Sequence, residues 1–166
     1  MKGVKRTLVS LGALILVSVT LSSQSFNADY KVALGLRAGY PSGITLKFKT
    51  ANESSVELLA GFWTGMFNLT ALYEKNVPAF DVEGMNWYFG GGGHITFLST
   101  RDKEHDWYYN RGEGYAIGLD GIVGLEYKIP PVPFAISIDL KPTIEIDRNS
   151  SVYFGIDPGL GIKFTF

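Results

Sequence analysis

The chain has 166 residues, of which 46% are hydrophobic, 14% are aromatic and 20 are glycine, and its formal net charge is -1. The absence of cysteine excludes disulfide scaffolds, thiol catalysis, cysteine-ligated zinc and iron–sulfur clusters. A net charge near zero without a basic block argues against a nucleic-acid-binding protein. The length suits one domain, and the excess of glycine and aromatic residues favours a closed β structure.

The N-terminal segment resembles an export signal in its order of residue types. Lys2, Lys5 and Arg6 precede an apolar run over residues 8–21, which small and polar residues follow. This order is typical of a secretory signal peptide, because a membrane-spanning helix needs roughly 20 apolar residues. We predict a signal peptide over residues 1–25, removed on export, and one mature domain over residues 26–166. An uncleaved membrane anchor is the alternative.

Alternation of apolar and polar residues dominates the rest of the chain. This period of two is the pattern of strands that have one apolar face. It predicts eight strands, over residues 30–40, 44–49, 56–63, 69–74, 85–97, 117–128, 134–146 and 154–166. A connection over residues 75–84 is longer than the other turns, and the longest loop covers residues 99–114. Pro142 and Pro158 fall within strands and predict local bulges there.

The predicted fold is all-β, an eight-stranded antiparallel up-and-down transmembrane β-barrel. Only helices and closed barrels satisfy every backbone group in lipid, and no segment after the signal peptide has 18 uninterrupted apolar residues. Both ends of an even-stranded barrel lie on the periplasmic side, so the loop over residues 99–114 is expected outside the cell. Aromatic residues gather near both strand ends, as in the girdles of such barrels; they are Tyr30, Trp87, Tyr127, Phe134 and Phe164 at one end and Tyr40, Phe62, Phe97, Tyr115 and Phe154 at the other.

The second face of these strands carries equal numbers of acidic and basic residues. Side chains fill an eight-stranded barrel, so charges enclosed there must pair. We predict an interior charge network of seven basic residues, Lys31, Arg37, Lys47, Lys49, Lys128, Lys141 and Lys163, and seven acidic residues, Glu57, Glu74, Asp120, Glu126, Asp139, Glu145 and Asp157. Asn86, Tyr88 and His94 are predicted as polar interior residues. In a soluble barrel, the alternative, the same charges would lie on the wet outer face.

Five segments resemble a family of small outer-membrane β-barrel proteins from the Bacteroidetes group. They are LGLRAGYPSGITLKF (34–48), FNLTALYEKNVPAF (67–80), GMNWYFGGGGHITF (84–97), GLDGIVGLEYKI (118–129) and ISIDLKPTIEI (136–146). The C-terminal GIKFTF, with Phe164 and Phe166, resembles the signal that the outer-membrane barrel-assembly machinery reads. The resemblance implies the fold, export through the periplasm and an outer-membrane location, and it brings no catalytic residues.

Three groups of residues are candidates for chemistry. The glycines at 90–93 have strand pattern on both sides and no following helix, which argues against a phosphate-binding loop. His94 shares its face with carboxylates, and a structural role is favoured over a base or a ligand. Exposed aromatic side chains in the long loop are candidates for contacts with a surface partner, a sugar or lipid headgroups; they are Trp107, Tyr108 and Tyr109.

The sequence favours a monomeric outer-membrane barrel with a closed, salt-bridged interior and a structural or surface-interaction role. No catalytic residue, metal or cofactor is expected. The expected partners are outer-membrane lipid, the barrel-assembly machinery and an unidentified surface ligand, and no nucleic acid. A narrow small-solute pore, an outer-membrane lipid A-modifying enzyme and a soluble periplasmic lipocalin-like carrier remain as alternatives.

Overall fold

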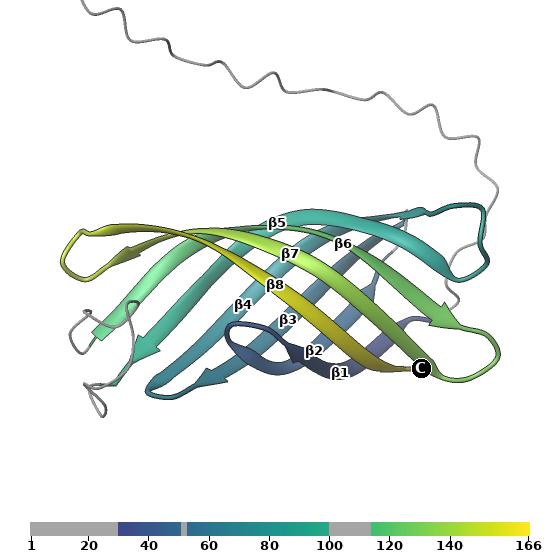
Figure 1. Ribbon diagram of the computed structural model, residues 1–166, viewed down its shortest axis with the longest axis horizontal. Helices are drawn as coiled ribbons and strands as arrows, with labels where there is room; N and C mark the ends of the chain where they lie inside the picture. Colours follow the sequence, from purple (N-terminus) through teal and green to yellow (C-terminus); the bar gives the residue numbers. More distant parts are fainter. Residues whose placement is uncertain (1–29, 51–52, 100–113) are drawn as a thin grey trace, which may run out of the picture.

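A computed structural model describes residues 30–50, 53–99 and 114–166, which form one closed barrel of eight antiparallel strands (Figure 1). The strands are β1 (Val32–Ala38), β2 (Ser42–Lys49), β3 (Ser54–Trp63), β4 (Met66–Pro78), β5 (Met85–Leu98), β6 (Gly114–Ile129), β7 (Phe134–Asp147) and β8 (Val152–Thr165). Each strand pairs with the next, and β8 pairs with β1. The predicted all-β, up-and-down barrel is thereby confirmed. None of the described residues forms a helix long and apolar enough to cross a membrane.

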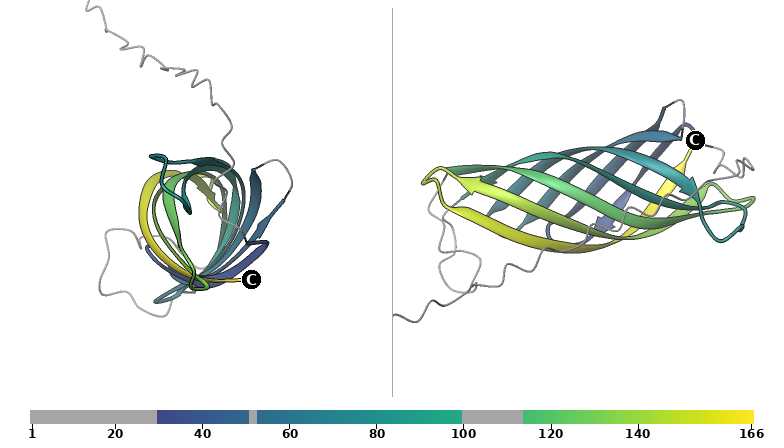
Figure 2. Two further views of the ribbon diagram at one scale, coloured as in Figure 1. Left: turned by 90° about the vertical axis from the view of Figure 1, so that its right-hand side faces the viewer. Right: turned by 90° about the horizontal axis from the view of Figure 1, so that it is seen from above.

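The register of the strands fixes the stagger of the barrel. When the paired residues are followed from Leu36 in β1 through each successive strand, the path reaches Val152 in β8. Leu36 itself pairs with Ile162, ten residues further along β8. A stagger of this size over eight strands corresponds to a strand tilt of about 40°. Figure 2 shows the resulting ring of tilted strands along the barrel axis.

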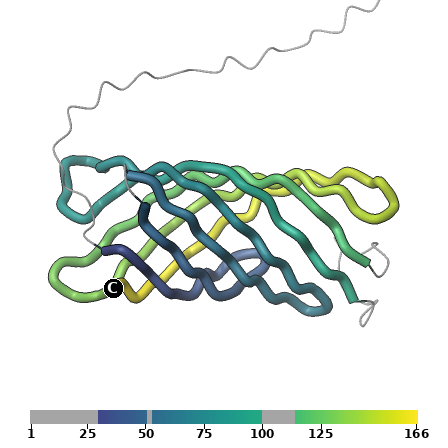
Figure 3. Tube along the Cα trace, turned by 180° about the vertical axis from the view of Figure 1, so that it is seen from behind, coloured from purple at the N-terminus to yellow at the C-terminus, as the bar shows by residue number. Residues whose placement is uncertain are grey.

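The two rims of the barrel differ in shape. At the rim where the chain ends at Phe166, the strands end at similar levels along the barrel axis. At the opposite rim, the β1–β2 hairpin ends well below the tip of the β7–β8 hairpin (Figures 1 and 3). Pairing between β1 and β8 stops at Ala38 and Leu160, although β8 begins at Val152. Residues Val152–Gly159 therefore pair with β7 but with no described strand on the β1 side. We call this segment the free edge of β8.

The connection between the fourth and fifth strands is shorter than the sequence predicts. Pairing of β4 with β5 continues to Pro78 and Asn86, so only residues 79–84 form the turn. The polar residues Lys75 and Asn76, which follow Glu74, look like the start of a loop in the sequence. In the structure, Glu74 and Asn76 are buried and point into the interior, which lets the strand continue.

The glycine run in β5 lies where the strands approach closely. A Cβ atom on Gly90 or Gly92 would collide with the carbonyl oxygens of Tyr73 and Ala71 in β4. The run therefore serves the sharp curvature of the barrel wall, as glycine does at barrel bends.

The predicted bulges at the two strand prolines are absent. The β6–β7 register is the same on both sides of Pro142, where the ladder only skips two pairs, and Pro158 pairs in register with Leu140. A bulge occurs instead at the start of β1, where the amides of Lys31 and Val32 both donate to the carbonyl oxygen of Phe166. Because two consecutive residues face the same partner, the inward and outward directions of the side chains are exchanged before β1.

The outward face of the barrel is apolar on all eight strands. Large hydrophobic side chains such as Leu36, Ile138 and Leu160 are exposed there. Aromatic rings contact one another near both rims, in the pairs Phe134–Phe164, Phe164–Phe166 and Phe80–Trp87 at one rim and Tyr40–Trp63, Phe62–Phe67 and Phe67–Phe97 at the other. Tyr30, an expected member of this outer face, is instead buried because the bulge before β1 turns it inward.

Candidate functional site: the charged interior

The interior of the barrel is filled with polar and charged side chains. Eleven of the fourteen charged residues predicted for it are buried; they are Arg37, Lys47, Glu57, Glu74, Asp120, Glu126, Asp139, Lys141, Glu145, Asp157 and Lys163. Asn86, Tyr88 and His94 are buried as well. All eight strands contribute to this set, because alternate residues of every strand point inward.

Three lysines predicted for the interior lie elsewhere. Lys31 is exposed, because the bulge before β1 turns it outward. Lys49 is half-buried at the rim, with its ammonium group 4.4 Å from the centre of the Tyr30 ring. Lys128 is half-buried and its ammonium group donates to the carbonyl oxygen of Val132 in the β6–β7 turn, at 2.8 Å. The interior therefore holds seven acidic and four basic residues among the described ones, which corrects the expected balance of seven against seven.

Two groups of ion pairs occupy this interior. The first charge cluster lies toward the rim with the chain ends and consists of Lys47, Glu57, Glu74, Glu126 and Lys163. Lys47 lies 2.8 Å from Glu74 and 3.5 Å from Glu126, and Lys163 lies 3.1 Å from Glu57 and 3.2 Å from Glu126. Each lysine is thus shared between carboxylates on different strands. Such sharing offsets the cost of removing these charges from water.

Two tyrosines complete the first charge cluster. The Tyr30 hydroxyl donates to Glu126 at 2.5 Å, and burial, followed by the nearby carboxylate, raises the pKa of Tyr30 well above its usual value. Tyr30 therefore stays a donor throughout the ordinary pH range. The Tyr88 ring lies 4.4 Å from the ammonium group of Lys47, and its hydroxyl donates to Asp139 at 3.0 Å. Tyr88 links the first cluster to the second.

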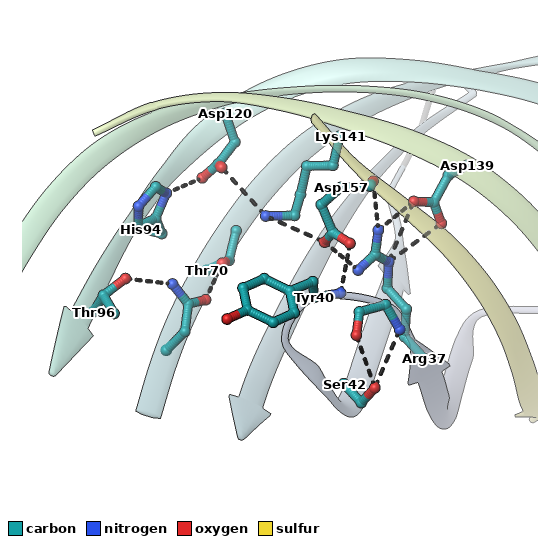
Figure 4. Close-up of polar contacts among 12 residues, drawn as sticks. Arg37, Tyr40, Ser42, Thr70, His94, Thr96, Asp120, Asp139, Lys141 and Asp157 are labelled. Atoms are coloured by element: carbon teal, nitrogen blue, oxygen red, sulfur yellow. Dashed lines mark hydrogen bonds and ion pairs between the residues drawn. The ribbon is translucent and has the colours of Figure 1, made fainter. Parts of the chain in front are cut away.

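The second charge cluster centres on Arg37 (Figure 4). It lies toward the rim that carries the β1–β2 and β7–β8 hairpins. Its members are Arg37, His94, Asp120, Asp139, Lys141, Glu145 and Asp157. The Arg37 guanidinium lies 2.5 Å from Asp139 and 2.7 Å from Asp157, so one cation from β1 holds carboxylates on β7 and β8. Asp157 also accepts from the backbone amide of Tyr40 at 2.6 Å, which ties the β1–β2 turn to β8. Lys141 lies 3.4 Å from Asp120 and 3.9 Å from Asp157.

His94 is held between two carboxylates. Its Nδ1 lies 2.8 Å from Asp120 and its Nε2 lies 2.8 Å from Glu145 (Figure 4 shows the contact with Asp120). Because an ionised carboxylate only accepts, both contacts are hydrogen bonds when the ring carries a proton on each nitrogen. With both nitrogens engaged, the ring has none left to act as a base or a metal ligand.

A chain of uncharged polar side chains extends from Glu145, and its members were not among the predicted interior residues. Thr96 donates to Glu145 at 3.1 Å, Asn68 donates to Thr96 at 2.8 Å, and Thr70 donates to Asn68 at 2.7 Å. The signal that could have found these residues is their inward position in the alternating pattern of β4 and β5. Among the described residues, no group of three or more His, Cys, Asp or Glu side chains could hold a metal ion.

Phe164 and Phe166 lie at the end of the chain, on the outward face of the barrel, and both are exposed. The signal peptide over residues 1–25 and the loop residues Trp107, Tyr108 and Tyr109 lie outside the described residues.

Comparisons with known proteins find a likeness to solved structures. No protein-family model matches the chain, and no curated protein matches it. A solved structure with a similar arrangement is that of Neisserial surface protein A (NspA), with a TM-score of 0.49 and 10% sequence identity, covering 81% of this chain and 93% of that chain. The resemblance of the sequence to Bacteroidetes-type barrels stays a prediction.

Proposed function

We propose that this protein is an integral outer-membrane β-barrel whose interior is closed by ion pairs and whose role is structural or in surface interaction, without catalysis. The observation that carries the proposal is the orientation of the two faces, with charged side chains inside the barrel and large apolar side chains outside. A soluble barrel of the lipocalin type needs the opposite orientation, because its core must be apolar.

The closed sheet suits a membrane for a second reason. In lipid, every backbone amide and carbonyl must find a partner within the protein, and a barrel achieves this between strands. The apolar belt runs around all eight strands, far beyond the few hundred Å² of continuous apolar surface that soluble monomers usually expose. The even number of strands and the aromatic contacts near both rims are also features of outer-membrane barrels.

The packing of the interior supports a closed barrel over a pore. The two charge clusters and Tyr88 fill the section between the rims, and a cavity of about 10 Å³ lies beside Arg37, Lys141 and Asp157. A space of that size holds about one water molecule, so there is little room for a solute beside Arg37.

Three measurements test this proposal. The mature protein should fractionate with the outer membrane and run faster on a semi-native gel before heating than after it. Recovery from the periplasm without detergent would contradict the membrane location. The purified barrel should give no steady conductance in planar bilayers, and reproducible single-channel steps would show an open interior. Deletion of the gene should leave the acylation of lipid A unchanged in mass spectra, whereas an altered pattern would support an enzyme.

A further inference from the structure

We propose that the free edge of β8 is a docking site for an extended segment of a partner polypeptide, which binds as an added strand. This proposal deepens the surface-interaction role proposed above and rests on it. The β7–β8 hairpin reaches well beyond the β1–β2 hairpin (Figures 1 and 3). The eight residues Val152–Gly159 are paired on the β7 side only, within the described part of the chain.

The hydrogen bonds near the C-terminal end of β8 show which of its backbone groups face the β1 side, where the free edge has no paired strand among the described residues. The Phe166 amide donates to the Val32 carbonyl on the β1 side, whereas the Thr165 amide donates to the Pro133 carbonyl on the β7 side. Because the direction alternates along an antiparallel strand, even-numbered residues of β8 direct their backbone groups toward the β1 side. Within the free edge these residues are Val152, Phe154, Ile156 and Pro158.

The position of Pro158 agrees with this pattern. Proline has no amide hydrogen and is tolerated within a sheet where its nitrogen faces an unpaired edge. Along β8, Pro158 is the next residue facing the β1 side after Leu160, which is the last one that pairs with β1. Three amides, of Val152, Phe154 and Ile156, and the carbonyls of all four even residues have no ladder partner among the described strands.

The chemistry of these groups selects the occupant. Only another extended backbone presents donors and acceptors at the matching spacing, whereas an acyl chain has neither and would leave all of these groups unpaired. A second copy does not fit in the same membrane. Two copies inserted in the same direction are related by an axis along the membrane normal, so their β8 strands, each tilted by about 40°, cross at about 80°.

The side chains beside the free edge indicate what the partner segment carries. Phe154 and Ile156 point outward and are 75% and 72% exposed, so apolar side chains of an added strand would pack beside them. On the inward side, Gly155 leaves room and Asp157 is already paired with Arg37. The partner is therefore an alternating segment of about five to seven residues, apolar outward and small or polar inward.

The test uses the full-length folded protein in detergent micelles and measures the exchange of individual amide hydrogens by NMR. The probe is a blocked peptide of alternating valine and threonine, and its control is the same peptide with N-methyl groups on one edge. The unmodified peptide should slow the exchange of the Phe154 and Ile156 amides by about tenfold or more. The methylated peptide should leave both rates unchanged, because it cannot complete the ladder.

Two variants separate docking from folding. Ile156→Pro removes an amide from the free edge without removing a bond to β7, so the barrel should stay folded and bind the peptide about fivefold more weakly or worse. Gly155→Pro removes a bond to β7 and should destabilise the barrel. Slow exchange of Phe154 and Ile156 without peptide, or unchanged binding by Ile156→Pro, overturns the docking site. Failure of the membrane proposal shows separately, as recovery of the protein without detergent.

Discussion

Replacement of Arg37 by methionine tests the reasoning about the interior most directly. Arg37 is 4% exposed and is the closest cation to both Asp139, at 2.5 Å, and Asp157, at 2.7 Å. Methionine keeps the apolar stem of the side chain but removes the guanidinium group and its charge. Asp139 then keeps the Tyr88 hydroxyl at 3.0 Å, and Asp157 keeps Lys141 at 3.9 Å and a backbone amide.

The expected loss follows from what the two carboxylates retain. Removing one partner of a buried pair costs about 3–5 kcal/mol, because the other charge stays buried without compensation. Two carboxylates lose their guanidinium, but each retains a hydrogen bond. We therefore expect Arg37→Met to lower the free energy of unfolding by about 5 kcal/mol rather than by twice that amount. This is a large share of the stability of a typical protein, which is about 5–15 kcal/mol.

The assay is urea unfolding of the barrel in lipid vesicles, followed by tryptophan fluorescence and checked by heat-dependent gel mobility. A triple variant with Arg37→Met, Asp139→Asn and Asp157→Asn removes both orphaned charges and should recover most of the loss. A loss below about 1 kcal/mol for Arg37→Met would mean that these charges are solvated, as on the surface of a soluble protein. The assigned orientation of the two faces would then be refuted.

Three further predictions concern other parts of the barrel. Ile138→Arg, on the outward face, should destabilise the barrel in vesicles by about 2–4 kcal/mol, whereas a change within about 0.5 kcal/mol would indicate a water-facing surface. Gly159→Ala should lower stability by about 2 kcal/mol in the same urea titration, because its Cβ would overlap the Arg37 guanidinium; Gly155→Ala is the control and should change little. Glu126→Gln should cost about 3 kcal/mol, since Glu126 accepts from a tyrosine and two lysines, while Glu74→Gln should stay within about 1 kcal/mol, since one Glu74 oxygen has no hydrogen-bond partner in the described structure. Equal losses for these two variants would contradict the assigned pairing.

The strands and their two faces were predictable because alternation is a local property. Once Arg37 and Lys163 are placed on the inward face of their strands, their burial follows from closure of the barrel. The interior position of Tyr88 and His94 follows from the same pattern. What the pattern does not contain is which charges meet, because Arg37 and Asp139 are 102 residues apart and their contact depends on the stagger of the strands.

Three features of the barrel were not predicted from the sequence, and each has a different physical cause. The bulge before β1 exchanges the faces of Tyr30 and Lys31, and it depends on the Phe166 carbonyl at the other end of the chain. The continuation of β4 past Glu74 looked like a loop, because polar inward residues and loop residues have the same composition. The free edge of β8 is invisible in the sequence of β8 itself, since it results from the shortness of the β1–β2 hairpin.

Arg37 has a consequence for how the barrel is completed. The seam between β1 and β8 joins only six residue pairs, from Ala33 to Ala38, against fourteen between β5 and β6. Arg37 on β1 reaches Asp157 on β8 across this seam, and its second partner lies one strand further, on β7. Until the first and last strands meet, the Arg37 guanidinium has neither of its carboxylate partners and remains hydrated. Hydrated charges resist entry into lipid, so at the proposed outer-membrane location these ion pairs would favour the insertion of a closed ring over that of an open sheet.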